Sequence, residues 1–454
     1  MSGYPHATHR PSYWLSQPGN LANHRTTEEL PKEADVVIIG SGYSGAAIAY
    51  HILKDPAERP SVVILEARET CSGATGRNGG HLKPDTYFNW ALYENMYGGP
   101  AASDLMKFEA QQVYEVKQLV EQEQIDCDFE LTRACDVYMN DEVAQNTVKA
   151  YRDMVRVGVA DTKDVHCIED PKKAEQVSGV KGAKAAFTFT AGHVWPYKMI
   201  IHLLRRCIEW GANLQTHTKA VAVDKSAAGG WNVSTLRGNI SAKRVVVATN
   251  GYTSALVSAF EGKITPVRGL ACRIAVPRGT TMAPHLNNSY SIRFGPKEYD
   301  YLIPRSDGSI VVGGAKQVVL KEQKYWYGNT NDSELIPGGE EYFNNYMQRT
   351  FHGWEQSDAR TTDIWTGIMG YSNDLMPYVG EMPGSEGLYV TAAYTGHGMP
   401  RILGCAKAIA SLLKNEKRDI SETNVPWPYW VTEKRLNSKE NVTRAYMVGE
   451  KAKL

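Results

Sequence analysis

The fold is decided by one stretch near the start of the chain, Ala34-Asp35-Val36-Val37-Ile38-Ile39-Gly40-Ser41-Gly42-Tyr43-Ser44-Gly45. Its first half is a short, β-branched apolar run, which predicts a buried parallel strand. A helical pattern follows over residues 46–53, and a second apolar run, residues 61–65, ends at Glu66. Strand, glycine turn, helix and second strand thus span about 33 residues, the size of a βαβ unit.

The three glycines of this stretch follow the Gly-x-Gly-x-x-Gly spacing. Gly40 permits a tight turn, Gly42 lets the backbone approach a pyrophosphate, and Gly45 allows the helix to pack closely on the strand. A glycine-rich turn that binds nothing is the alternative. The preceding strand, the following helix and a carboxylate at Glu66, which can accept hydrogen bonds from ribose hydroxyls, favour a dinucleotide site.

Three further segments favour FAD over NAD as the dinucleotide. Residues 71–81 are rich in small and hydroxyl side chains, residues 248–252 follow a strand in the middle of the chain, and residues 394–399 precede the last helix. A helix N-terminus after residues 394–399 could stabilise the negative charge of a reduced flavin. The predicted FAD-binding residues are Gly40, Ser41, Gly42, Tyr43, Ser44, Gly45, Glu66, Ala67, Arg68, Gly73, Ala74, Thr75, Arg77, Asn78, Gly79, Gly80, Val221, Thr249, Asn250, Gly251, Gly367, Gly396, His397, Gly398 and Met399.

The rest of the chain suggests a second domain inserted into the first. Residues 100–173 have a helical, charged pattern, and residues 264–320 alternate like antiparallel strands with glycine-rich turns. A last strand at 387–392 and a last helix at 402–413 return to the dinucleotide-type pattern. Dinucleotide-type segments therefore occur early, in the middle and late, with strand-rich and helical stretches between them.

Composition narrows the possible partners. Lys plus Arg and Asp plus Glu both number 50, so the formal charge is zero, and we expect neither nucleic acid nor an anionic membrane as partner. No apolar run approaches the roughly 18 to 20 residues that span a bilayer. The first thirty residues lack the apolar core of a secretory signal. The seven cysteines are scattered and predict free thiols in a reducing compartment, and no metal site is predicted.

Several motifs carry a resemblance to a known superfamily. The most specific are residues 73–80, 124–129, 192–196, 365–367, 376–380 and 395–398, within a similarity that runs from about Ser12 to about residue 430. On these motifs the chain resembles the D-amino-acid-oxidase/glycine-oxidase superfamily of FAD-dependent oxidoreductases, and within it most closely the group of gamma-glutamylputrescine oxidases.

The resemblance implies an α+β protein. A discontinuous, Rossmann-like FAD-binding domain of the glutathione-reductase type would carry an inserted substrate domain built on an antiparallel sheet. The expected boundaries are an N-terminal extension over 1–32, an FAD-binding domain over 33–95, 190–256 and 364–415, a substrate domain over 96–189 and 257–363, and a C-terminal extension over 416–454.

The same resemblance implies oxidation of a C–H bond next to a primary or secondary amine. Hydride would pass to flavin N5, an imine would form, and oxygen would reoxidise the flavin to give hydrogen peroxide; the partners would be a small-molecule amine and oxygen. The alternative is an amine or amino-acid dehydrogenase that passes electrons to another carrier. An aromatic flavin monooxygenase would need Gly-Asp before the late helix, where the chain has Gly396-His397. An FAD-binding scaffold without redox activity is a further alternative.

The chain departs from its relatives in two places. Relatives like sarcosine oxidase attach flavin to a cysteine near the position of Ile368 and Met369, so non-covalent FAD is expected here, with a link to His81 as the alternative. Those relatives also place a lysine after the Gly-His-Gly motif to hold a substrate carboxylate, whereas this chain has Pro400. Recognition of simple α-amino acids by that route is therefore not expected.

The candidate catalytic residues are those expected beside the flavin ring. His81, Trp195, Tyr301, Tyr371 and His397 could wall the substrate pocket, although each also has an interpretation as an ordinary core residue. Lys316 follows two glycines and could supply the positive charge that helps oxygen accept an electron, the alternative being a surface lysine.

The last three residues, Ala452-Lys453-Leu454, resemble a peroxisomal import signal. They predict a peroxisomal location, with an import receptor as partner, and otherwise a cytoplasmic one. An oxidase that forms hydrogen peroxide would fit a compartment that contains catalase.

Overall fold

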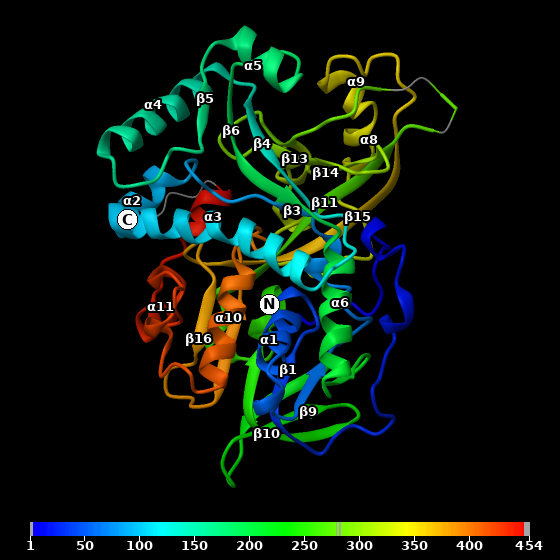
Figure 1. Cartoon of the computed structure of the whole chain (residues 1–454), viewed down its shortest axis with the longest axis vertical. Helices are drawn as coiled ribbons and strands as arrows, with labels where there is room; N and C mark the ends of the chain where they lie inside the picture. The colour runs from blue at the N-terminus through cyan, green and yellow to red at the C-terminus, as the bar shows by residue number, and fades with distance from the viewer. Residues whose placement is uncertain (1–2, 278, 281–282, 449–454) are drawn as a thin grey trace.

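The predicted βαβ unit lies at the centre of the first of two large sheets (Figure 1). A computed structural model describes residues 3–277, 279–280 and 283–448. β1 (Glu33–Ile39) pairs in parallel with β2 (Val62–Leu65) on one side and with β10 (Gly238–Val247) on the other. Residues 36–39 are all buried, because β1 is an inner strand with apolar side chains packed on both of its faces.

The first sheet runs in the order β16-β17-β10-β1-β2-β7, with β8 and β9 attached beyond β10. Its inner pairs are parallel, whereas β16 with β17, β8 with β9, and β9 with β10 are antiparallel. The remaining strands of this sheet are β7 (Asn213–Gln215), β8 (Ala220–Lys225), β9 (Trp231–Thr235), β16 (Tyr378–Glu381) and β17 (Leu388–Ala392).

Three helices pack together against the first sheet: α1 (Tyr43–Leu53), α6 (Pro196–Glu209) and α10 (Ile402–Leu413). α1 is buried along its whole length, and α10 has the bounds expected from the sequence. α1 starts after Gly42, which has no side chain with which to cap the helix. The backbone amides of its first turn lie at the cavity described below. Among the described side chains, only that of Thr75 accepts from Tyr43 N, through Oγ1 at 3.0 Å.

The second sheet runs in the order β15-β11-β14-β13-β12-β4-β6-β3, and β5 pairs with β6 on the same side as β3. All its pairs are antiparallel except β12 with β4, so the expected antiparallel sheet forms with one parallel junction. Its strands are β3 (His81–Leu82), β4 (Glu130–Tyr138), β5 (His166–Ile168), β6 (Ala185–His193), β11 (Ile264–Ala275), β12 (Ser289–Arg293), β13 (Tyr299–Pro304), β14 (Ile310–Gly314) and β15 (Arg360–Ser372).

The expectation of a helical stretch over residues 100–173 is only partly right. α3 (Gly99–Gln122), α4 (Asp141–Val157) and α5 (Pro171–Ser178) form there, but β4 and β5 interrupt them. β4 is a strand because β6 and β12 supply hydrogen-bonding partners on both of its sides, and those partners are remote in sequence. The charged residues of β4 are compatible with a helix as well as with a strand, and for this reason the sequence pattern predicted a helix there.

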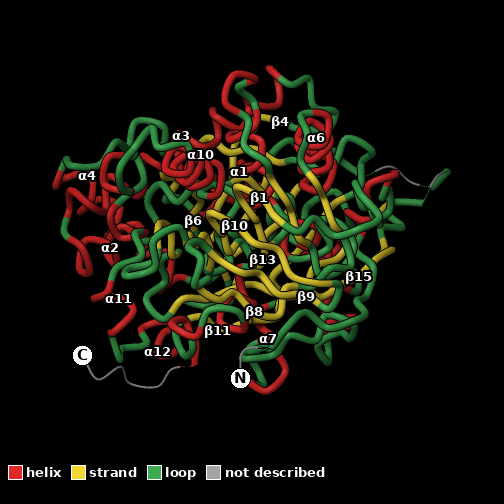
Figure 2. The backbone as a smooth tube through the Cα atoms, turned by 90° about the horizontal axis from the view of Figure 1, so that it is seen from below, coloured by secondary structure: helices red, strands yellow, loops and turns green. Residues whose placement is uncertain are grey.

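The other helices are α2 (Trp90–Tyr97), α7 (Lys316–Val319), α8 (Gly339–Phe343), α9 (Tyr346–Thr350), α11 (Glu433–Asn437) and α12 (Val442–Val448). Seen from below in Figure 2, strands fill the middle of the molecule, and α2, α11 and α12 lie toward its edge. α3 lies across the molecule between the two sheets and contacts α10 of the first sheet and β6 of the second. One helix, α3, therefore contacts elements on both sides of the cavity that lies between the two sheets.

The expected domain boundaries at residues 190 and 364 fall inside β6 and β15, both of which belong to the second sheet. The N-terminal segment packs on the loop at 73–80 and holds it: Ser12 Oγ donates to Gly76 O and Trp14 Nε1 donates to Asn78 O, each at 2.5 Å, and the Trp14 side chain is fully buried. No helix within the described residues is long and apolar enough to cross a bilayer. Ala452-Lys453-Leu454 lie outside the described residues, and peroxisomal import stays a prediction.

Candidate active site

A cavity of about 460 Å³ lies between the two sheets. One end is walled by the turn after β1 and by Glu66, and the other by residues of β12, β13, β14 and β15. The cavity thus joins the dinucleotide motif of the first sheet to the inserted second sheet. Of the predicted FAD-binding residues, those that line it directly are Gly40, Gly42, Tyr43, Ser44, Glu66, Ala67, Arg68, Gly73, Ala74, Thr75, Arg77, Asn78, Gly79, Thr249, Asn250, Gly367, Gly396, His397, Gly398 and Met399.

The turn after β1 needs glycine for steric reasons. Gly40 has a φ of +114°, and a Cβ there would lie 2.6 Å from Ala248 O. A Cβ on Gly45 would lie 1.9 Å from Gly40 O, so no side chain fits between the helix and the turn. The roles that the sequence predicted for these two glycines are therefore consistent with the local geometry.

Glu66 is held ready to accept hydrogen bonds from a ligand. Its Oε2 accepts from Ser41 N at 3.1 Å and Ser41 Oγ at 2.7 Å, and its Oε1 accepts from Arg68 N at 3.1 Å. These contacts orient the carboxylate, and Oε1, which accepts only one of them, keeps acceptor capacity for a ribose hydroxyl. The half-buried side chain faces the cavity, as a dinucleotide site requires.

Two arginines and a buried carboxylate lie beside this turn. Arg68 and Arg77 both pair with the buried carboxylate of Asp332, Arg68 Nη1 to Oδ1 at 2.9 Å and Arg77 Nε to Oδ2 at 3.2 Å. Burial lowers the pKa of Arg77 to about 10, although Asp332 opposes that effect. Because the Glu66 carboxylate also lies near Arg68, the two guanidinium charges are balanced, and the uncapped backbone amides at the start of α1 are what suits this wall to a pyrophosphate.

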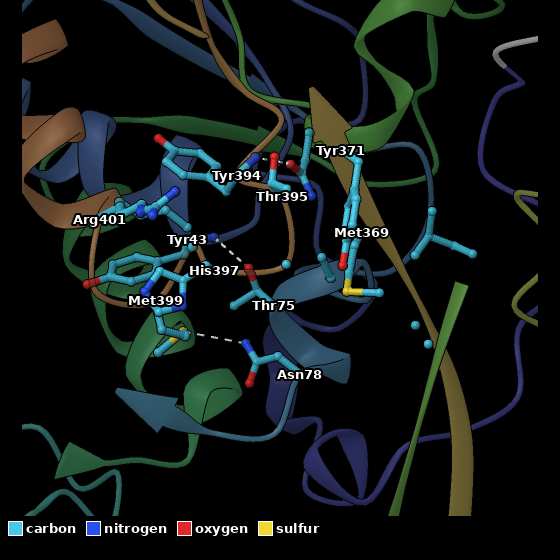
Figure 3. Close-up of a pocket in the computed structure, with 18 of the residues that line it drawn as sticks. Tyr43, Thr75, Asn78, Met369, Tyr371, Tyr394, Thr395, His397, Met399 and Arg401 are labelled. Atoms are coloured by element: carbon cyan, nitrogen blue, oxygen red, sulfur yellow. Dashed lines mark hydrogen bonds between the residues drawn. The ribbon is translucent and has the colours of Figure 1, made fainter. Parts of the chain in front are cut away.

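The segments at 367–371 and 393–399 form the next part of the wall (Figure 3). Thr395 N donates to Gly370 O at 2.7 Å, and Asn250 Oδ1 accepts from Ala393 N at 3.0 Å, which ties three distant segments together. Ala393 and Thr395 have φ values of 61° and 52°, a costly conformation for residues other than glycine. The Gly-His-Gly loop is thus held in a strained shape at the cavity, as is common at functional sites.

His397 is anchored by a carboxylate that sequence reasoning missed. Glu109 of α3 is buried, and its Oε2 accepts from His397 Nε2 at 2.7 Å while its Oε1 accepts from Arg401 Nε at 2.7 Å. Burial alone would raise the pKa of Glu109, but Arg401 and His397 lower it to about 2. Glu109 is therefore ionised at neutral pH and fixes the orientation of the His397 ring. No local pattern in α3 distinguishes it from the other glutamates of that helix.

Four other predicted catalytic residues line the cavity: His81, Tyr301, Lys316 and Tyr371. His81 Nε2 lies 2.8 Å from Ser289 Oγ, and burial, together with the charge of Lys83, holds its pKa well below the ordinary value, so the ring is neutral at pH 7. The Tyr301 ring packs closely on the glycine backbones of residues 79 and 313. Tyr371 lies beside the Gly-His-Gly loop, bridged to Tyr394, and the other three come from β3, β13 and the start of α7.

Lys316 is not a surface lysine. It is 5% exposed and lines the cavity just after β14. Burial lowers its pKa to about 8, and the Asp300 carboxylate offsets part of that effect. Because this pKa is above 7, the ammonium group is mostly protonated at neutral pH and places a positive charge at the cavity wall.

The structure corrects the prediction for Trp195. Its side chain is buried outside the cavity lining, and its Nε1 donates to Trp14 O at 2.8 Å. The ring also packs edge-on against Trp14, with centroids 5.6 Å apart. Trp195 precedes α6, where it holds the N-terminal segment in place, so it is a core residue.

Five predicted FAD-binding residues do not line the cavity themselves but contact residues that do. Ser41 supports Glu66, Gly45 packs on Gly40, Gly80 N donates to Asn78 Oδ1 at 2.7 Å, and Gly251 packs against the backbone of Met369. The carbonyl of Val221 accepts from Tyr4 OH at 2.9 Å, and Tyr4 lines the cavity in its place. No sequence pattern links residue 4 to residue 221, so only the fold could show this contact.

Sequence reasoning also missed a polar group at the far end of the cavity. Its members are Lys83, Asp136, Arg293 and Lys297, beside the aromatic residues Tyr87, Phe88, Phe189 and Tyr299. Arg293 ends β12, whose five residues are all buried, but the sequence Ser289-Tyr290-Ser291-Ile292 gives no local signal of that burial. All seven cysteines are free, and none is among the described residues that line the cavity.

A glycine turn that suits a pyrophosphate, an oriented acid for a ribose and a second sheet that closes the cavity define the class of FAD-dependent oxidoreductases. The protein family described as FAD dependent oxidoreductase (DAO) matches residues 35–412, well over half of the chain, and the chain belongs to this family. Its cofactor is FAD.

Individual relatives are more distant. The chain is 26% identical over 430 residues to gamma-glutamylputrescine oxidoreductase of Escherichia coli K12, with 90% of each chain covered. It is 22% identical to glycine oxidase of Bacillus licheniformis, which covers 82% of this chain and 90% of the relative. Among solved structures, glycine oxidase from Geobacillus kaustophilus superposes with a TM-score of 0.71 at 21% identity, covering 88% of this chain and 99% of that one. The structural likeness confirms the fold.

Proposed function

We propose that this protein is an amine oxidase that uses non-covalent FAD and oxygen. The observation that carries the proposal is one cavity that extends from the glycine turn and Glu66 of the first sheet to an aromatic and polar wall on the second. FAD held there would supply a two-electron acceptor for the hydride from the carbon next to a neutral amine, whose nitrogen gives up a proton as the imine forms, and the same two electrons would reduce oxygen to hydrogen peroxide.

Two of the similar proteins support an amine as the substrate. One is named as an oxidoreductase of gamma-glutamylputrescine, and the other as an oxidase of glycine. Both names refer to compounds with an amine group. The described cavity lining contains no cysteine that could form a thioether to the flavin, which supports non-covalent attachment.

The residues of the wall are suited to an uncharged amine. His81 is neutral at pH 7 and brings no positive charge toward the reacting nitrogen. The Glu109 carboxylate fixes His397 in the Gly-His-Gly loop by a 2.7 Å hydrogen bond. Lys316 supplies a buried positive charge, which stabilises negative charge that develops on oxygen as it is reduced.

The test is rapid mixing of the holoenzyme with amines in the absence of oxygen, followed by a second mixing with oxygen. The flavin absorbance should bleach with a primary or secondary amine and return on addition of oxygen, with one hydrogen peroxide formed per amine oxidised. Bleaching that oxygen does not reverse, but that a quinone does, would instead identify a dehydrogenase. A panel of amines and amino acids that never bleaches the flavin would refute the proposal.

A further inference from the structure

Residues 3–11 form an N-terminal arm that lies along one side of the cavity. The first strand of the βαβ unit begins only at Glu33, and the arm belongs to neither sheet. Tyr4 and Pro5 of the arm nevertheless line the cavity itself. A segment outside both sheets therefore supplies two residues of the cavity wall.

Tyr4 lies at the end of the cavity where Glu66 is found. Its hydroxyl donates to Val221 O at 2.9 Å, and Ala255 O lies 3.2 Å from the same hydroxyl oxygen. The chain just before Val221 is bonded to the Glu66 segment, since Thr218 N donates to Glu66 O at 2.8 Å. Because an acid at the place of Glu66 accepts hydrogen bonds from the adenosine ribose of a dinucleotide, the arm meets the cavity at its adenosine end.

The ring of Tyr4 is held in one orientation among apolar neighbours. Its hydroxyl is anchored to the main chain, and the Lys219 ammonium lies 4.8 Å from the ring centroid. Ala220 and Leu256, which also line the cavity, adjoin in the chain the two residues whose carbonyls contact the Tyr4 hydroxyl, and Pro5 adds further apolar surface. A fixed aromatic ring with apolar neighbours is suited to stacking on a flat base such as adenine.

Buried arginines of the cavity wall hold the arm in place. Arg68 Nη1 donates to His6 O at 3.2 Å, and Arg77 Nη1 donates to Arg10 O at 2.8 Å. Both arginines are buried, so these main-chain carbonyls satisfy donors that would be costly to leave unpaired. Arg10 N also donates to Asp332 O at 2.9 Å. The arm is therefore tied to side chains of the cavity wall, and the fold sets its position.

We propose that Tyr4 and Pro5 bind the adenosine part of FAD, so that the arm is part of the cofactor site. The Tyr4 ring stacks on the adenine, and the bond from its hydroxyl to Val221 O keeps the ring at the cavity. The flavin part of the cofactor belongs at the other end, beside the second sheet, and makes no contact with the arm. This assignment concerns only the cofactor and does not depend on which substrate the protein oxidises.

The experiment separates the two ends of FAD. Apoprotein is titrated with FAD and FMN, followed by quenching of flavin fluorescence, and with ADP, followed by calorimetry. Tyr4→Ala should weaken the binding of FAD and of ADP by a common factor of roughly 5-fold to 150-fold, the range for loss of an aromatic ring that stacks on a base. FMN lacks the adenosine, and its affinity should stay within about twofold of the wild-type value.

Two further variants test the role of the ring. Tyr4→Phe keeps the ring and loses the hydroxyl, so its FAD affinity should fall by about tenfold at most and by less than that of Tyr4→Ala. The matched control is Tyr151→Ala. Tyr151 is also half-buried, and its hydroxyl donates to a main-chain carbonyl, Val165 O at 3.0 Å, but it does not line the cavity. This variant should bind all three ligands as the wild type does.

Unchanged binding of FAD and ADP to Tyr4→Ala would overturn the proposal. Equal losses for ADP and FMN would also overturn it, because the ring would then support the fold and not the adenosine. Tighter FAD binding would mean that the arm occupies the adenosine position, which contradicts the proposal as well.

Hydrogen exchange on the wild-type protein decides the matter if Tyr4→Ala does not fold. The amides of residues 3–11 should gain protection when FAD binds to the apoprotein and should gain none when FMN binds. Equal protection by the two flavins, or no protection by FAD, would refute a contact between the arm and the adenosine.

Discussion

The ion pair between α3 and α10 offers a quantitative prediction. Glu109→Gln removes the charge that faces Arg401, whose side chain is 3% exposed, and leaves that guanidinium buried without its anion. The pKa of Glu109 falls from an ordinary 4.5 to about 2 on folding. At 1.36 kcal/mol per pH unit, this difference corresponds to about 3 kcal/mol of stability. Breaking a buried ion pair by removal of one partner costs a similar amount, about 3 to 5 kcal/mol.

The pH dependence has a definite sign. Because the pKa of Glu109 is lower in the folded state, its contribution is fully present above the unfolded pKa and is lost as the pH falls from about 5 toward 2. The free-energy difference between wild type and Glu109→Gln should therefore be about 3 kcal/mol at pH 7.5 and smaller by roughly 1 kcal/mol at pH 3.5. Urea unfolding followed by tryptophan fluorescence, with FAD present in excess, measures both values.

A matched control exists on the same pair of helices. Glu115 of α3 pairs with Lys407 of α10 at 2.7 Å, but the two side chains are 33% and 42% exposed. Glu115→Gln should cost less than about 1 kcal/mol, as expected for a surface pair. If Glu109→Gln costs no more than Glu115→Gln, or if its cost is the same at pH 7.5 and 3.5, the assignment of Glu109 as a buried anchor is wrong.

Three further predictions concern the cavity and its support. Glu66→Ala should weaken FAD binding by about 1.5 to 3 kcal/mol, measured by titration of apoprotein, and an unchanged affinity would exclude a role in ribose binding. Reoxidation of the reduced enzyme by oxygen should slow as the pH rises through about 8, where Lys316 loses its proton. Reoxidation of Lys316→Met should be slow at every pH, whereas the control variant Lys321→Met, at an exposed lysine, should keep the wild-type dependence of the reoxidation rate on pH. A Lys316→Met variant with the wild-type pH dependence would contradict this role. Trp195→Phe should lower stability by about 1 kcal/mol through loss of the bond to Trp14 O, with flavin reduction by substrate unchanged, whereas slower reduction at full FAD content would return Trp195 to the site.

Most of the fold prediction depended on the spacing of residues that are close together in sequence. The glycine turn, the acid at Glu66 and the helix at 402–413 depend on residues that are close in sequence, and the structure confirms each element. The character of β4 could not be predicted in this way, because its strand conformation depends on partners in β6 and β12. Charged residues at its start matched a helix as well as a strand.

The sequence by itself determined the family and the glycine turn, since a phosphate-binding turn is a short-range feature of backbone and glycine spacing. Only the tertiary structure decided which charges meet. Arg68 and Asp332 are 264 residues apart, and Glu109 and His397 are 288 residues apart, yet each pair forms one buried contact. Only the fold placed Trp195 in the core and Arg293 at the cavity. Burial and electrostatic pairing depend on surroundings that segments remote in sequence supply, and for this reason no local pattern encodes them.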